Sequence, residues 1–102
     1  MTRKPAESCQ SMAELRAQID ALDMDLVRLL AERAGYIDRA AALKMVDGQP
    51  ARIGSRVEEV VANVRAEALA DGLDADLIEL IWRQLIEWSI RREERVLGSE
   101  GA

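Results

Sequence analysis

The sequence predicts an all-α fold of three helices, long, short and medium, and two observations support it. Apolar residues recur at steps of three and four along three separate stretches, which is the period of an α-helix. The apolar residues are mainly Ala, Leu, Ile and Val, with two Trp, one Tyr and no Phe in 102 residues. Ala and Leu favour helices whereas aromatic residues favour strands, and a chain of this length forms a single domain.

The first helix is predicted over residues 12–45. Ser11 and Glu14 have the spacing of a capping box, and no proline interrupts the apolar pattern before Pro50. Such a helix would be about 50 Å long, whereas a compact domain of this size is about 30 Å across. We therefore expect a homodimer in which the long helices cover each other; the alternative is a monomer whose first helix breaks at Gly35.

Two shorter helices follow a predicted loop over residues 46–54, which contains Gly, Asp and Pro. Ser55 and Glu58 form a second capping-box pattern, which opens a helix through Leu69, and Gly72 is expected to end it. Asp74 is the expected N-cap of a third helix that runs to about residue 97. The domain is therefore predicted over residues 11–98, with disordered tails at 1–10 and 99–102.

Charge and composition argue against several classes of function. A net charge of −5 disfavours a general nucleic-acid binder and binding to anionic membranes. No apolar run could span a membrane, and the first ten residues lack the core of a signal peptide. The single cysteine, Cys9, cannot form an internal disulfide, so we expect a cytoplasmic protein. The chain has no histidine, the commonest general base and zinc ligand, and we expect neither a metal nor a cofactor.

Two cationic side chains bracket a strip of mostly small residues on the first helix. Arg33 and Lys44 are eleven positions apart, which places them on nearly the same helix face. The residues between them on that face are Ile37, Ala40 and Ala41. This strip could be the floor of a site for a small anion, or both side chains could extend into solvent. Arg16 faces elsewhere, so it could join such a site only from a partner subunit.

In the third helix, Ser89 and Glu93 are four positions apart on the face that also carries Ile86 and Ile90. A hydroxyl and a carboxyl group thus lie beside apolar neighbours and could line a site. Alternatively, Glu93 belongs to the charged run 91–95 and is exposed to solvent. The spacing leaves both interpretations open.

Together these residues resemble the all-helical (type II) chorismate mutases over residues 13–98. The segments that carry the resemblance are Leu15-Arg16, 19–23, 29–33, Lys44, Arg56 and 85–90. The resemblance implies an intertwined homodimer with two equivalent sites for a small dianionic substrate. It implies an isomerase of the shikimate pathway and aromatic amino acid biosynthesis, which converts chorismate to prephenate by a Claisen rearrangement.

The resemblance also implies a role for each cationic residue. Arg16 of the partner subunit and Arg33 would bind the two substrate carboxylates. Lys44 would contact a carboxylate and the ether oxygen of the substrate, and Arg56 would close the site from the loop side. Such a clamp suits a unimolecular reaction that needs an oriented substrate and stabilised ether oxygen, with no nucleophile or metal.

For the third helix, the resemblance implies that Ser89 lines the wall and that Glu93 donates a hydrogen bond to the ether oxygen. A carboxylate cannot donate a hydrogen bond, so Glu93 must be protonated when it does so. We hypothesise that activity falls as Glu93 ionises with rising pH and that Glu93→Gln flattens this dependence. The other expected pocket-lining residues are Ala40, Ile53, Val57, Ile86 and Ile90.

Two residues depart from the pattern of the mutases. Many of them carry a Glu that binds the ring hydroxyl at the position of Val57, and some carry an Asp at the position of Ile53. The related isochorismate-pyruvate lyases of salicylate biosynthesis also have an apolar residue at the Val57 position, and they resemble this chain in the 72–75 turn and around Trp88. Cleavage of isochorismate is therefore the alternative activity. A non-catalytic helical dimerisation or regulatory module is the alternative of another class, in which the cationic groups would point into solvent.

Overall fold

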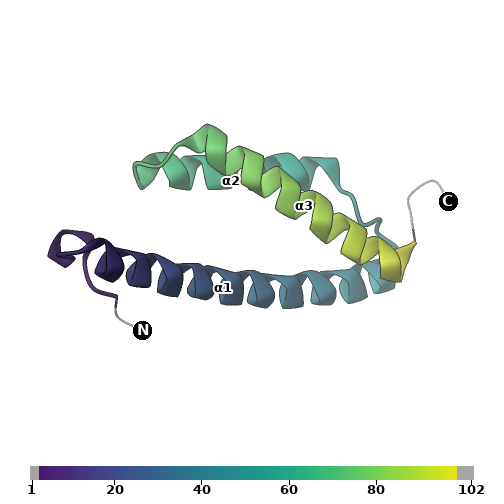
Figure 1. Ribbon diagram of the computed structural model, residues 1–102. Helices are drawn as coiled ribbons and strands as arrows, with labels where there is room; N and C mark the ends of the chain where they lie inside the picture. Colours follow the sequence, from purple (N-terminus) through teal and green to yellow (C-terminus); the bar gives the residue numbers. More distant parts are fainter. Residues whose placement is uncertain (1–2, 99–102) are drawn as a thin grey trace. The chain divides into compact units, whose positions relative to one another are not determined.

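The computed structural model describes residues 3–98, which contain three α-helices and no strand (Figure 1). Helix α1 spans Met12–Asp47, α2 spans Gly54–Ala70 and α3 spans Ala75–Leu97. The predicted all-helical class and the order of long, short and medium helices are confirmed. None of these helices is both long and apolar enough to cross a membrane. The chain divides within α1 into two compact units, Met1–Gly35 and Tyr36–Ala102, which we describe in turn.

In the first unit, residues 3–10 fold back along the start of α1. They include a short 3-10 helix, Ala6–Ser8. Lys4 Nζ and the backbone N–H of Gln10 both bind Glu14 Oε2, at 3.1 and 2.7 Å, and Arg3 pairs with Asp25 at 2.6 Å. Residues 3–10 are therefore attached to the helix and do not form the disordered tail that was expected. The attachment is made by charged groups, which leave no trace in the pattern of apolar residues. Residues 1–2 and 99–102, the rest of the two expected tails, lie outside the described residues.

The part of α1 in the first unit has an uncovered apolar face. The helix continues through Gly35 without a break, and none of its residues from 12 to 35 is buried. The exposed fractions along the stripe are 39% for Leu22, 50% for Leu26, 59% for Leu29 and 42% for Leu30. A regular row of exposed leucines on a helix is expected to be covered by another protein surface.

The turn between α2 and α3 forms as its sequence predicts. Gly72 adopts a left-handed conformation with φ 72°, which lets the backbone N–H of Leu73 reach the carbonyl of Ala68 at 2.8 Å. Asp74 Oδ1 accepts hydrogen bonds from the backbone N–H groups two and three residues later, at 2.9 and 3.3 Å. The predicted helix end and N-cap are therefore both confirmed.

The start of α2 differs from its prediction. The helix begins at Gly54, one residue earlier than expected, and no side chain caps it. The Ser55–Glu58 capping box does not form, because the Glu58 carboxylate binds the guanidinium group of Arg83 on α3, at 3.0 and 3.2 Å. A bidentate ion pair with an arginine competes well with a single hydrogen bond to the helix start.

Helices α2 and α3 lie side by side in the second unit (Figure 1) and enclose a small core. Its buried members are Ala51, Val61, Ile86 and Ile90, flanked by Val57, Val60 and Leu97. Ile86 and Ile90, expected to line the pocket, are 6% and 4% exposed and belong to this core. The face of α3 that carries them is therefore fixed against α2, which also fixes the direction of Ser89 and Glu93.

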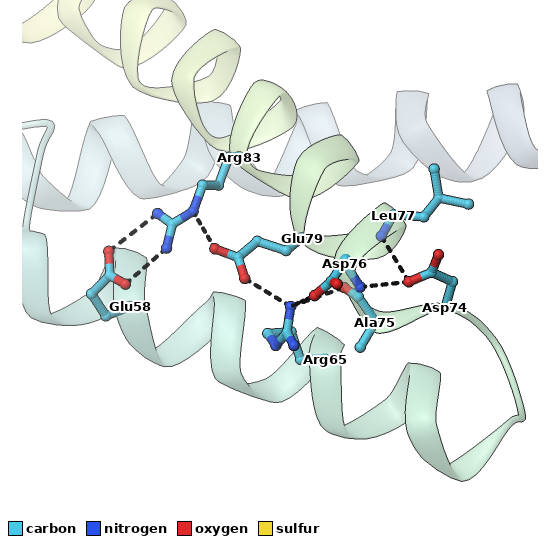
Figure 2. Close-up of polar contacts among 8 residues, drawn as sticks. All are labelled: Glu58, Arg65, Asp74, Ala75, Asp76, Leu77, Glu79 and Arg83. Carbon is cyan, nitrogen blue, oxygen red and sulfur yellow. Dashed lines mark hydrogen bonds and ion pairs between the residues drawn. The ribbon is translucent and has the colours of Figure 1, made fainter.

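An ion-pair network joins the outer surfaces of α2 and α3 (Figure 2). Arg83 of α3 binds Glu58 of α2 and also Glu79, one turn away, at 2.7 Å; Arg65 of α2 binds Glu79 and Asp76 at 2.9 and 3.0 Å. The hydrogen bonds from Arg83 lower the pKa of both Glu58 and Glu79. Each exposed pair adds little stability, but the alternating charges fix the register of the two helices.

Candidate active site

The centre of the candidate site is a buried ion pair between α1 and α3. Lys44 Nζ lies 2.7 Å from Glu93 Oε1, and the two side chains are 18% and 6% exposed. The contact lacks the alignment of a hydrogen bond, and Glu93 Oε1 accepts no hydrogen bond within the described residues. Of the two interpretations of Glu93, solvent exposure is therefore wrong. Placing a carboxylate in a core is costly unless a cation accompanies it, and Lys44 supplies that cation.

Lys44 has a second partner, the backbone carbonyl of Ala51, which accepts a hydrogen bond from Nζ at 2.7 Å. An ammonium group has three N–H donors. With one donor directed at the carbonyl of Ala51 and the charge shared with Glu93, the group retains donor capacity for a further acceptor. Two partners on different elements also fix the direction of a side chain that is otherwise flexible.

Ser89 lies one turn before Glu93 on the buried face of α3 and is 3% exposed. Its hydroxyl donates a hydrogen bond to the carbonyl of Leu85 at 2.8 Å. The expected juxtaposition of Ser89 and Glu93 on one buried helix face is present.

Lys44 also borders an open hollow of about 410 Å³. The other lining residues are Met45, Gly48, Gln49, Pro50, Leu97 and Gly98. Lys44 thus connects a buried carboxylate with a solvent-accessible space. A hollow of this size is within the range of small-molecule sites.

Arg56, Ile53 and Val57 lie at the junction of the loop with α2. The Arg56 side chain is 63% exposed, and its guanidinium group binds Glu59 of the same helix at 2.6 Å. Ile53 and Val57 are half-buried, and Val57 packs against the core. In this arrangement Arg56 is engaged at the surface, and its contribution to a site requires that it exchange Glu59 for another anion.

The remaining predicted residues lie on α1. Arg16, exposed, and Arg33, half-buried, belong to the first unit. Ala40, half-buried, belongs to the second unit, and its neighbour Ala41 is 2% exposed. These two alanines before Lys44 therefore lie on the face of α1 that is shielded from solvent.

Sequence reasoning missed three participants around Lys44. The carbonyl of Ala51 is a backbone group, for which side-chain patterns carry no signal. Arg52, the next residue, binds Glu87 of α3 through two parallel hydrogen bonds of 2.8 and 2.6 Å. The opposite charges of Arg52 and Glu87 were visible, but helical spacing cannot relate a loop residue to a position on another helix.

Comparison with known proteins places these residues in a family. Residues 15–94 match the family model described as chorismate mutase type II. The chain is 32% identical over 94 residues to the isochorismate pyruvate lyase of Pseudomonas aeruginosa, and the match covers 88% of each chain. It is also 30% and 34% identical to the T-proteins of Haemophilus influenzae and Enterobacter agglomerans, over 84% and 80% of this chain. It spans only 23% and 22% of those two proteins.

Lys44 and Glu93, which form the buried ion pair, both fall inside the matched region, as do the arginines expected to bind the substrate. The matched region also extends over all three helices. The chain belongs to the chorismate mutase type II family.

Proposed function

We propose that the chain catalyses the rearrangement of chorismate to prephenate as an intertwined homodimer. The observation that carries this proposal is the buried Lys44–Glu93 pair, which holds an ammonium group beside a carboxyl group at the edge of an open hollow. The reaction breaks a C–O bond without a nucleophile, so its demands are an oriented substrate and donors for the ether oxygen. An ammonium group and a protonated carboxyl group would be two such donors.

The uncovered apolar face of α1 supports the homodimer. Leu26 and Leu29 are at least half exposed, and none of the described residues of the first unit, 3–35, is buried and could form a core of its own. A second copy carries the same stripe, and a symmetric pairing would cover both stripes at once. In such a dimer, Arg16 would reach the site of the partner subunit, as the family resemblance implies.

The cationic residues would divide the work of binding. Arg33 and the partner's Arg16 would bind the two substrate carboxylates, since a guanidinium group binds a carboxylate through two parallel hydrogen bonds and so fixes its orientation. Lys44 would use its remaining donor on the ether oxygen as negative charge develops there. Arg56 would leave Glu59 for the incoming dianion and close the site from the loop side.

A second candidate activity is the release of pyruvate from isochorismate. Ile53 and Val57 offer no hydrogen-bonding group to a ring hydroxyl, and the match to the named lyase covers nearly all of both chains. The same clamp would hold isochorismate, whose two carboxylates present the same charge. The mutase stays the first candidate because residues 15–94 match the chorismate mutase type II family model.

The direct test is to incubate the protein separately with chorismate and with isochorismate. We expect prephenate from chorismate, at least a hundredfold faster than with a Lys44→Met variant, since one lost donor costs about 10²–10³ in rate. Salicylate and pyruvate from isochorismate, without prephenate from chorismate, would establish the lyase instead. If the protein forms neither prephenate nor salicylate and pyruvate, a non-catalytic role as a helical dimer is the remaining function.

A mixing experiment tests the shared site. Arg16→Ala and Lys44→Met homodimers are each expected to be nearly inactive. When they are denatured together and refolded, half of the dimers combine the two variants, and each of these contains one intact site. The mixture should therefore recover about a quarter of the wild-type activity. If Arg16 served its own subunit, the mixture would stay inactive, and sedimentation would confirm that dimers had formed.

A further inference from the structure

The segment of residues 48–53, which we call the interhelix loop, joins α1 to α2 and is anchored at two neighbouring residues. Ala51 points inward: it is 5% exposed and belongs to the core with Val61 and Ile86. Arg52 points outward and binds Glu87 of α3. Successive residues of the loop thus attach it to the core on one side and to the surface of α3 on the other.

The outer attachment has the geometry of a well-formed ion pair. Both nitrogens of the Arg52 fork bind both oxygens of Glu87, at 2.8 and 2.6 Å, and the two side chains are 44% and 43% exposed. The hydrogen bonds from Arg52 lower the pKa of Glu87. The pair therefore persists at pH values where an isolated glutamate would begin to take up a proton.

These contacts link the interhelix loop to α3 at two points, once through Lys44 and once through Arg52. Glu93 of α3 contacts Lys44, Lys44 donates to the carbonyl of Ala51, and the next residue, Arg52, returns to α3 at Glu87. Glu87 and Glu93 are six positions apart, or about 9 Å along the helix axis. The position of the Ala51 carbonyl, and with it the direction of Lys44 Nζ, therefore depends on where Arg52 attaches the loop.

The same attachment reaches the first turn of α2. The carbonyl of Ile53, the last residue of the interhelix loop, accepts the backbone N–H groups of Arg56 and Val57, at 3.0 and 3.1 Å. A shift of the loop would therefore displace Arg56 as well as Lys44. Two of the four cations expected at the site, Lys44 and Arg56, are therefore hydrogen-bonded to backbone carbonyls of the loop that this ion pair attaches to α3.

We propose that Arg52 and Glu87 are positioning residues, which hold the interhelix loop so that Lys44 and Arg56 meet the substrate. The proposal rests on the proposed function only where it predicts an effect of these residues on the turnover of chorismate. The attachment of the loop can be measured without any substrate. Neither residue is expected to touch the substrate.

The test uses Glu87→Gln, which removes the negative charge of the pair. The variant keeps Arg52, after which trypsin can cleave. We expect cleavage after Arg52 to become about tenfold faster and kcat/KM for chorismate to fall about tenfold, because small displacements of catalytic groups are costly. The matched control is Glu58→Gln, which breaks the comparable pair with Arg83 between α2 and α3 but leaves the interhelix loop attached. It should change neither quantity.

Rescue separates positioning from general loss of structure. The reversed pair Arg52→Glu/Glu87→Arg should recover most of the turnover that each single reversal loses, and Arg52→Lys should lie between wild type and Arg52→Glu. Circular dichroism checks that each variant is folded. If the wild-type enzyme is active, the proposal is overturned when Glu87→Gln changes neither cleavage nor turnover, or changes only one of them, or when the reversed pair recovers nothing.

The two proposals fail in distinguishable ways. A wild-type protein that converts neither chorismate nor isochorismate contradicts the proposed function, while faster cleavage of Glu87→Gln would still show that the pair holds the loop. An active wild-type enzyme whose Glu87→Gln variant is equally active and equally resistant to trypsin contradicts the positioning role alone.

Discussion

Replacing Lys44 with methionine is expected to reduce both activity and stability. The turnover of chorismate should fall by at least about a hundredfold, because the variant lacks a donor for the ether oxygen. The free energy of unfolding should fall by about 3 kcal/mol, because Glu93, with 6% of its side chain exposed, is left as a buried carboxylate without its cation. Steady-state kinetics and urea denaturation measure the two effects on the same preparation.

A double variant separates the structural from the catalytic role of Lys44. In Lys44→Met/Glu93→Met, two apolar side chains replace the ion pair, so stability should return to within about 1 kcal/mol of wild type. Activity should stay as low as in the single variant. Arg28→Met, which removes an exposed partner of Asp25, is the control and should change stability by less than about 0.5 kcal/mol. A double variant that regains turnover would show that Lys44 acts only through stability.

The fold was predictable because its local signals agree. Apolar residues with helical spacing define α1 and α3, and Asp74 and Gly72 mark the turn before α3 with the chemistry that the turn uses. Where a side chain could either cap its own helix or bind a residue distant in the sequence, the distant contact forms. Glu58 illustrates this: its capping-box spacing is correct, but Arg83 takes its carboxylate across to α3.

The candidate site was predictable only in part, for the same physical reason. Periodicity places Ser89 and Glu93 on one face of α3, and the resemblance assigns Lys44 a role. Neither determines that Lys44 and Glu93 are in contact, because that depends on how α3 packs against the end of α1. The Arg52–Glu87 pair likewise depends on tertiary geometry, and its residues carry no local signal that separates them from other surface charges.

The pH dependence of turnover should depend on Glu93. The chain has no histidine, and arginine side chains stay charged between about pH 5 and about pH 8. A Glu93 that must donate a hydrogen bond loses that ability when it ionises. We therefore expect kcat/KM to fall by up to about tenfold per pH unit as the pH rises, and Glu93→Gln to remove this slope, since an amide donates at every pH.

The control for this experiment is Glu58→Gln, which removes a surface carboxylate and should keep the wild-type slope. Calorimetry adds a measurement that does not depend on turnover. In the free protein Glu93 lies 2.7 Å from Lys44 as its counter-ion, so binding a non-reactive cyclic ether dicarboxylate should take up about one proton per site. Buffers of different ionisation enthalpy reveal this uptake, which Glu93→Gln should lack. Identical pH profiles for wild type and Glu93→Gln would mean that Lys44 stabilises the ether oxygen alone and that Glu93 serves to hold Lys44 in place.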